Sequence, residues 1–224
     1  MNTIIIDIGG SNVKVWKTGE TDKVKFRSGK RFTPSALVKR VNEVASDWLF
    51  ERVSIGYPGH VLNGKPVTEP LNLGTGWVEF DFVSAFNVPV RIMNDACMQA
   101  LGSYEGGRML YIGLGTSTGT SFIIDGLIVP LALGRLRFRR GESFDESLSF
   151  KGLESHGAKK WRRLVSKAVR VLKSAFLVDY VVLGGGNAKK LREIPDGCRR
   201  GGNHNAYFGG LRMWQDATIA EPSS

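Results

Sequence analysis

The stretch IIIDIGGSNVKVW, residues 4–16, decides the fold. Its isoleucines predict a strand that is buried on both faces and ends on Asp7. Gly9-Gly10-Ser11 then forms a tight turn before a second β-rich run. Two interpretations remain open. Asp7 caps its own turn in a simple hairpin, or the turn binds phosphate through backbone N–H groups and the Ser11 hydroxyl while Asp7 orients a hydrated Mg²⁺.

The composition is that of a globular protein: 224 residues, 42% hydrophobic and 23% charged. This length allows one large domain or two small ones. No apolar run approaches membrane-spanning length, and the chain opens on a strand rather than a signal peptide. Cys97 and Cys198 form neither a disulfide framework nor a metal-ligand pattern. We therefore expect a cytoplasmic protein with no membrane partner.

The positive charge is concentrated in the last part of the chain. Residues 1–133 hold 13 Lys and Arg against 12 Asp and Glu, whereas residues 134–224 hold 18 against 9. Most of the excess lies in residues 135–142 and 158–173. Such a band can attract nucleic acid, inorganic polyphosphate or nucleotide phosphates, or it can serve solubility alone.

Residues 158–173 have the pattern of an amphipathic helix. Its apolar stripe consists of Trp161, Leu164, Val165, Ala168, Leu172 and Ala175. The lysines and arginines fall on the opposite face. A solvated face and a polyanion-binding face both remain open.

The first half of the chain predicts a hairpin followed by alternating helices and strands. Thr33 and Pro34 are suited to cap and begin a helix. The expected elements are strands at 4–7, 13–16, 24–27, 53–57 and 90–93, and helices at 34–50 and 96–104.

The second half repeats the opening arrangement. MLYIGLGTSTGTSFIIDG, residues 109–126, reads as strand, Gly/Thr turn, return strand and a further turn. A buried strand at 177–183 is followed by Gly184-Gly185-Gly186-Asn187. Residues 198–217 end in a C-terminal helix. Two similar α/β halves are the simplest account of this pattern.

The order of the motifs resembles the ROK family of sugar kinases, within the actin-like ATPase superfamily. The motifs are DIGGSNVK (7–14), SIGYPGHV (54–61), NLGTGW (72–77), MNDA (93–96), GLGTSTGTSFIIDG (113–126) and VVLGGGNAKKL (181–191). The short length, the lack of a cysteine-rich zinc loop and the Trp-containing helix before the GGG strand are most similar to the polyphosphate-glucokinase branch.

The resemblance implies two actin-like (ribonuclease H-like) α/β domains around a central cleft. The N-terminal domain would span residues 1–96, joined by a C-terminal helix at about 210–224, and the C-terminal domain would span 97–209. Closure of the two domains would exclude water from the reaction.

The resemblance also implies roles for single residues. Asp95 would be the general base that accepts the proton of the attacking hydroxyl, and Asp7 would hold hydrated Mg²⁺. Asn72, Asn94, Gly59 and Arg135 would lie at the sugar. The residues expected at the donor phosphates and the nucleotide are Gly9, Gly10, Ser11, Asn12, Lys14, Gly115, Thr116, Ser117, Thr118, Gly184, Gly185, Gly186 and Asn187.

The chain departs from the family at one motif. Where the family has Glu-Leu-Gly-His, this chain reads Ala132-Leu133-Gly134-Arg135. Alanine cannot hydrogen-bond a sugar, and Arg135 introduces a fixed positive charge. Three outcomes stay open: weak sugar kinase activity, a different acceptor such as an anionic one that pairs with Arg135, or a sugar- or nucleotide-binding protein that has lost turnover.

The function predicted from the sequence is transfer of a phosphoryl group from ATP or inorganic polyphosphate to a hexose hydroxyl with Mg²⁺. The choice between the two donors stays open. A pantothenate-kinase-like enzyme of the same superfamily is a further alternative, because DIGGSNVK also resembles that opening. A nucleic-acid partner is disfavoured by the lack of a recognition motif, and a homodimer is left open.

Overall fold

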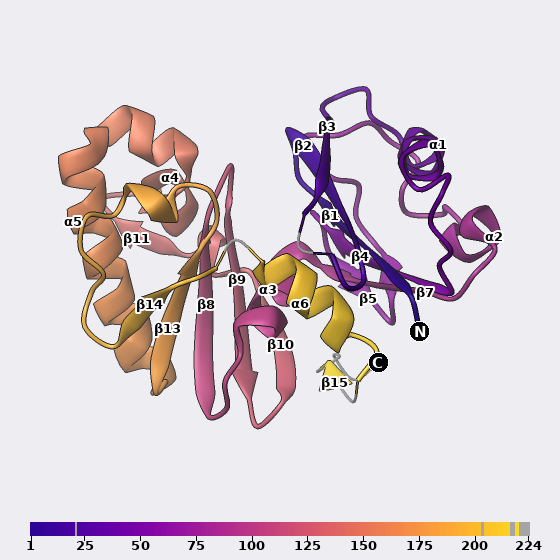
Figure 1. Cartoon of the computed structure of the whole chain (residues 1–224). Coiled ribbons are helices and arrows are strands. Elements are labelled where there is room, and N and C mark those ends of the chain that lie inside the picture. Colours follow the sequence, from indigo (N-terminus) through magenta and orange to yellow (C-terminus); the bar gives the residue numbers. More distant parts are fainter. Residues whose placement is uncertain (21, 203, 216–217, 220–224) are drawn as a thin grey trace.

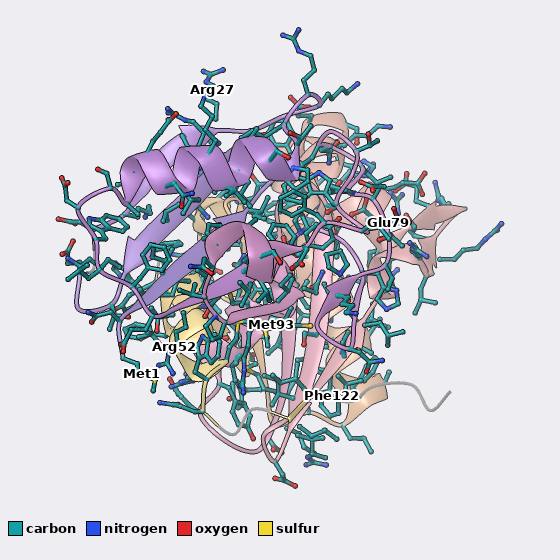
Figure 2. All side chains as sticks on the ribbon, turned by 90° about the vertical axis from the view of Figure 1, so that its right-hand side faces the viewer. Met1, Arg27, Arg52, Glu79, Met93 and Phe122 are labelled. Atoms are coloured by element: carbon teal, nitrogen blue, oxygen red, sulfur yellow. The ribbon has the colours of Figure 1, made fainter. Side chains whose placement is uncertain are left out.

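The computed structural model describes residues 1–20, 22–202, 204–215 and 218–219. Two β-sheets lie side by side with two helices between them, and further helices cover the outer faces (Figure 1). Figure 2 shows Arg27 and Glu79 directed outward, whereas Met93 lies in the interior and is 3% exposed. The predicted class, an α/β protein with two actin-like halves, is confirmed.

The first sheet has the strand order β3-β2-β1-β4-β7. Its strands are β1 (Thr3–Ile8), β2 (Asn12–Lys17), β3 (Val24–Arg27), β4 (Arg52–Tyr57) and β7 (Val90–Asn94). The first three strands pair antiparallel, while β4 and β7 run parallel to β1. All six residues of β1 are buried because helices cover both faces of the sheet. Helices α1 (Pro34–Val44) and α2 (Phe82–Phe86) cover the outer face, and a small hairpin joins β5 (Val61–Leu62) to β6 (Lys65–Pro66).

The second sheet repeats this order as β10-β9-β8-β13-β14, with β15 added beside β10. Its strands are β8 (Arg108–Leu114), β9 (Thr118–Ile124), β10 (Leu127–Leu131), β13 (Tyr180–Gly184), β14 (Cys198–Arg200) and β15 (Thr218–Ile219). Outside it lie the 3₁₀ turn η1 (Leu133–Arg135), the hairpin β11 (Arg137–Arg139) and β12 (Glu142–Ser143), helices α4 (Phe144–Leu148) and α5 (Phe150–Phe176), and η2 (Ala188–Lys190). The antiparallel meander followed by two parallel strands therefore occurs twice. This agrees with the predicted repeat of strand, glycine turn and return strand in two similar α/β halves.

Helices α3 (Asp95–Ser103) and α6 (Asn205–Arg212) pack against each other between the sheets. The two helices approach so closely that a Cβ on Gly209 would overlap the carbonyl oxygen of Met98. The neighbouring Gly210 lies against Ile5 of β1. Gly209 has no room for a side chain because two helix backbones meet there, and Gly210 has none because the Ile5 side chain occupies the space.

Trp214, just after α6, ties the C-terminal segment to the first sheet. Its indole Nε1 donates to Ser54 Oγ at 2.8 Å, and Ser54 Oγ donates to the Gly210 carbonyl at 2.6 Å. The guanidinium carbons of Arg52 and Arg91 lie 4.9 and 4.7 Å from the ring centroid. Figure 2 shows Arg52, the first residue of β4, near Met1.

We expect Trp214→Ala to lower the free energy of unfolding by about 1–3 kcal/mol, because the ring packing and two cation–π contacts are lost together. Urea denaturation measures this change. Trp214→Phe, which keeps a ring but removes the N–H donor, should lose about 1 kcal/mol. Equal unfolding midpoints for the wild-type protein and both variants would contradict a stabilising role for Trp214.

Several predicted helix boundaries are wrong. The helix predicted at 34–50 ends at Val44, and Trp48 N donates to the Ala45 carbonyl in a turn. The helix predicted at 158–173 begins at Phe150 and is kinked at Gly157, whose φ is 72°. The C-terminal helix starts at Asn205 rather than about 210 and ends at Arg212, and residues 216–217 and 220–224 lie outside the described residues.

The apolar stripe of α5 differs from the prediction at two positions. Ala175 is exposed, because the next core-facing position after Leu172 is Phe176, which packs against the core. Val169 is 1% exposed and packs in the core. The strand predicted at 177–183 begins at Tyr180, since Leu177 adopts a left-handed conformation that ends α5.

Candidate active site

Three glycine loops open into one cleft of about 420 Å³ between the two halves. The loops follow the carboxyl ends of β1, β8 and β13. The predicted site residues that line this cleft are Asp7, Gly9, Gly10, Lys14, Asn72, Asp95, Gly115, Thr116, Ser117, Gly184, Gly185 and Gly186. The cleft therefore brings together residues that are up to about 180 positions apart in the chain.

The first loop holds an acidic and a basic group in contact. Asp7 and Lys14 are cross-strand partners on β1 and β2, and Lys14 Nζ lies 2.6 Å from Asp7 Oδ2. Asp7 is 4% exposed, so the ammonium supplies the partner that a buried carboxylate needs. Gly9 N donates to the Asn12 carbonyl at 3.0 Å, which closes the turn. Gly10 lies against Asn72, since a Cβ on Gly10 would be 3.0 Å from Asn72 Cβ.

The second loop, Gly115 to Ser117, presents exposed Thr116 and Ser117 side chains to the cleft. Thr118 does not do so: its hydroxyl is buried without a partner, and its backbone N–H donates to Asp145 Oδ1 at 2.5 Å. Asp145 was not predicted from the sequence, because its first-turn position in α4 has the pattern of an ordinary helix start.

The third loop, Gly184 to Gly186, is fixed by its contacts with β8. Gly185 has a φ of 78°, and a Cβ there would lie 2.6 Å from the Leu114 backbone. Gly184 lies against the hydroxyl of Tyr111, so a side chain would collide with the phenol. The backbone N–H of Asn187 donates to the Leu114 carbonyl at 2.9 Å. Asn187 therefore anchors the loop and is not among the residues lining the cleft.

Tyr111 and Gln99 form a pair on the cleft wall that the sequence did not indicate. Tyr111 Oη donates to Gln99 Oε1 at 2.7 Å, and both residues line the cleft. Burial raises the pKa of the Tyr111 phenol, as do the negative charges of Asp95 and Asp7, so the phenol keeps its proton. The carbonyl oxygen of Gln99 is engaged by Tyr111, which directs the amide NH₂ elsewhere. Gln99 lies one helical turn after Asp95, on the same face of α3.

Asp95 stands at the first position of α3, where β7 ends. The side-chain oxygen of Asn94 accepts hydrogen bonds from the N–H groups of Ala96 and Cys97, which caps the helix. Burial in the protein and, to a lesser degree, the negative charge of Asp7 raise the pKa of Asp95 from 3.8 to about 7. The carboxyl group can therefore accept a proton near neutral pH, which suits a general base.

A second cavity, of about 610 Å³, lies on the other side of Asn94. Gly59, Asn94 and Arg135 line it together with Ala132. Asn94 Nδ2 donates to the Gly59 carbonyl at 3.0 Å, which fixes the amide at the cavity wall. Arg135 is exposed and forms no ion pair with any described residue. Pro58 and Leu71 line both cavities, so the two spaces meet beside the Asn94-Asp95 pair.

Some predicted site residues lie apart from both cavities. Ser11, Asn12, Thr118 and Asn187 are absent from the two linings, and Asn72 lines only the glycine-loop cleft. None of the described residues that line this cleft comes from the cationic band at 135–173. The band is carried mainly by α5, on the side of the second sheet that faces away from the first sheet (Figure 1). A larger hollow of about 890 Å³ beside α2 holds none of the predicted site residues.

Two features are missing from the part of the chain that the structure describes. No group of three or more His, Cys, Asp or Glu side chains is arranged to hold a metal ion there. No helix among these residues has the length and apolar character needed to cross a membrane.

Comparison with known proteins extends the similarity seen in the motifs. No family model matches the chain. Polyphosphate glucokinase of Mycobacterium tuberculosis is 25% identical over 206 residues, which cover 83% of this chain and 77% of that protein.

Two solved structures share the fold over nearly their whole length. The inorganic polyphosphate/ATP-glucomannokinase of Arthrobacter sp. strain KM superposes with a TM-score of 0.80 at 22% identity, covering 95% of this chain and 97% of that one. A ROK-family glucokinase from Streptomyces griseus, in complex with glucose and AMPPNP, gives 0.79 at 15% identity, with 95% and 99% covered. The chain thus has the fold of ROK sugar kinases and is similar in sequence to polyphosphate glucokinases.

Proposed function

We propose that this chain is a sugar kinase that transfers a phosphoryl group from ATP or inorganic polyphosphate to a hexose hydroxyl. The observation that carries the proposal is the position of Asp95, a carboxyl group with a pKa of about 7 that lines the glycine-loop cleft. Its neighbour Asn94 lines the second cavity, which also contains Arg135 and which we call the Arg135 cavity. The similarity to polyphosphate glucokinases supports the same reaction class.

In the proposed reaction each cavity holds one substrate. The donor phosphates lie against the glycine loops, where backbone N–H groups and Lys14 offset their charge. The acceptor lies in the Arg135 cavity, with its hydroxyl beside Asp95. Asp95 accepts the hydroxyl proton as the oxygen attacks the terminal phosphorus, and the phosphate or nucleotide leaving group stays on the loops. Asn94 offers an amide within reach of the acceptor.

The residues present fit a Mg²⁺ ion. Asp7 and Asp95 are two carboxyl groups close enough for one to raise the pKa of the other, and Mg²⁺ typically needs only one or two protein carboxylates besides phosphate and water oxygens. Asp7 would hold the ion through its hydration shell. When bound, Mg²⁺ would neutralise charge on the donor phosphates. Lys14 would then turn from Asp7 toward the phosphates.

The residues that line the Arg135 cavity favour a kinase whose acceptor selectivity differs from that of kinases with Glu-Leu-Gly-His at this motif. Ala132 presents no hydrogen-bonding side chain to the cavity, whereas Arg135 presents an unpaired guanidinium. A neutral hexose can be held by Asn94 and by backbone groups, and an acidic sugar could in addition pair with Arg135. A binding protein without turnover is the second candidate, favoured by the engagement of Asp7 with Lys14.

A phosphorylation screen of the wild-type protein tests the proposal. ATP and polyphosphate serve as donors, and glucose, mannose, N-acetylated hexosamines and acidic sugars as acceptors. We expect turnover of at least one hexose, with a rate that rises with pH through about 7 as Asp95 loses its proton. The variant Arg135→Ala should lose turnover of acidic sugars selectively if that side chain recognises the acceptor.

A folded protein that transfers no phosphoryl group from either donor would contradict the kinase proposal. In that case, a rise in melting temperature with a sugar or a nucleotide would favour the binding protein. The pH profile of turnover tests the role of Asp95 as base separately from the kinase activity itself. Turnover that is independent of pH between 6 and 8 would leave a kinase whose base is not Asp95.

A further inference from the structure

The outer face of α5 carries a straight row of positive charges. Lys160, Arg163, Lys167 and Arg170 are spaced by three, four and three residues, so they lie on one face of the helix. Lys160, Arg163, Lys167 and Arg170 are all exposed, while the opposite face packs into the core through residues such as Trp161. A helix rises 1.5 Å per residue, so the row is about 15 Å long.

This row forms one wall of a groove on the surface of the second half. The groove has a volume of about 620 Å³, and residues 192–193 form its other side. We call it the α5 groove. Its cationic lining residues are Lys160, Arg162, Arg163, Lys167, Arg170 and Arg192. Glu193 is the only carboxylate among the described residues that line it.

The positive charges of the α5 groove are not neutralised within the described chain. None of its six cations forms an ion pair with a described carboxylate. Residues 158–173 contain no Asp or Glu at all. Like charges three or four residues apart destabilise a helix, and a merely solvated helix face usually mixes both signs. The row thus favours an anionic ligand that offsets the repulsion.

Contacts connect the α5 groove to the rim of the glycine-loop cleft. Arg162 Nε donates to the Lys190 carbonyl at 2.8 Å, and Lys190 Nζ lies 5.7 Å from the centroid of the Phe150 ring. The backbone N–H of Phe150 in turn donates to the Gly115 carbonyl at 2.8 Å. Lys190 therefore stands between the groove and the second phosphate loop, and it extends the positive charge toward the cleft.

We propose that the α5 groove is a second binding site, outside the cleft, for long chains of inorganic polyphosphate. The proposal rests on the proposed function, in which polyphosphate is a phosphoryl donor. A polyphosphate chain carries a negative charge on every unit, which matches a row of cations along a helix. No aromatic side chain is among the described residues lining the groove, so it lacks the stacking platforms with which proteins hold single-stranded nucleic acid.

A charge-reversal variant with a matched control tests this site. The groove variant is Arg163→Glu, Lys167→Glu and Arg170→Glu. The control reverses three exposed lysines of the first half, Lys30→Glu, Lys39→Glu and Lys65→Glu, and so makes the same change in net charge. Binding of long-chain polyphosphate is measured directly at several salt concentrations, with tripolyphosphate as a ligand too short to span the row. Thermal melts verify that both variants are folded.

We expect the groove variant to bind long-chain polyphosphate about 10–100-fold more weakly at low salt, with the slope of log K against log salt reduced by about 2. The ratio of the affinity for long-chain polyphosphate to the affinity for tripolyphosphate should also be lower in the groove variant. The control variant should stay within about threefold of the wild-type affinity at about 0.1 M salt, where charges farther away than a Debye length of about 10 Å are screened.

Three outcomes would overturn the site. The first is an equal loss of affinity in the control variant, which would mean attraction by net charge alone. The second is wild-type affinity in the groove variant. The third is tighter binding of single-stranded RNA than of polyphosphate of equal charge to the groove. This result would identify nucleic acid as the ligand of the groove. Failure of the kinase proposal is detected separately, as absence of transfer from both ATP and polyphosphate by the wild-type protein. Polyphosphate binding that depends on the groove would support the site even then.

Discussion

We expect Asp95→Asn to reduce kcat for the proposed phosphoryl transfer about 10²–10⁴-fold, because the amide cannot accept the proton of the attacking hydroxyl. The amide keeps the size and shape of the carboxyl group, so substrate binding should change little. We therefore expect the loss in kcat rather than in KM. Initial rates at pH 8, where the wild-type carboxyl group is deprotonated, measure the effect most directly.

The same substitution should make the protein more stable at alkaline pH. The pKa of Asp95 is raised in the folded state to about 7 from 3.8, so between these values the folded state binds more protons than the unfolded state. Ionisation of Asp95 therefore destabilises the folded protein increasingly as the pH rises from about 4 to 7, and the cost is constant above that. A shift of about 3 pKa units sets an upper limit of about 4 kcal/mol for this cost at pH 8.

Urea denaturation of Asp95→Asn at pH 8 and at pH 4 tests this prediction. We expect the variant to be more stable than the wild-type protein at pH 8 and the difference to shrink toward zero at pH 4. Asp47→Asn makes the same chemical change at an exposed position and should change stability little at either pH. An inactive Asp95 variant that gains no stability at pH 8 would contradict the raised pKa, and an active variant would contradict the role as base.

Local sequence patterns were sufficient to predict the architecture. The run Ile4 to Ile6 and its counterpart at 109–112 are apolar without alternation, which is typical of strands covered on both faces. Each is followed by glycines and a return strand, and the structure confirms the same strand order in both halves. Asn94, placed between a strand and a helix, has the pattern of a helix cap, and its side chain caps α3.

Features that depend on tertiary contacts could not be predicted in this way. Tyr111 lies within an apolar strand, and nothing local indicates that its hydroxyl meets Gln99 in the cleft. Asp145 begins a short helix, and its contact with Thr118 N depends on how α4 packs against β9. The direction of the cationic face of α5 is likewise set by which side of the second sheet the helix covers.

Gly209→Ala should lower the free energy of unfolding by about 2 kcal/mol, although alanine favours helices more than glycine does. The added methyl group would overlap the carbonyl oxygen of Met98 in α3, and the obstacle is backbone rather than a flexible side chain. The overlap is relieved only if α3 and α6 move apart, and this movement opens the core between the two sheets around Met98 and Ala206. Overpacking of this kind costs about 1–3 kcal/mol or more, and it outweighs the gain of about 1 kcal/mol in helix propensity.

Ala175→Val is the matched control, because it adds two methyl groups to an exposed position on another helix and should change stability by less than about 0.5 kcal/mol. Urea denaturation of both variants at pH 7 measures the difference. Because α3 begins with Asp95, separation of α3 from α6 should also lower the rate of phosphoryl transfer at temperatures where Gly209→Ala is still folded. If Gly209→Ala unfolds at the wild-type urea concentration, the two helices do not approach as closely in solution as the overlap requires.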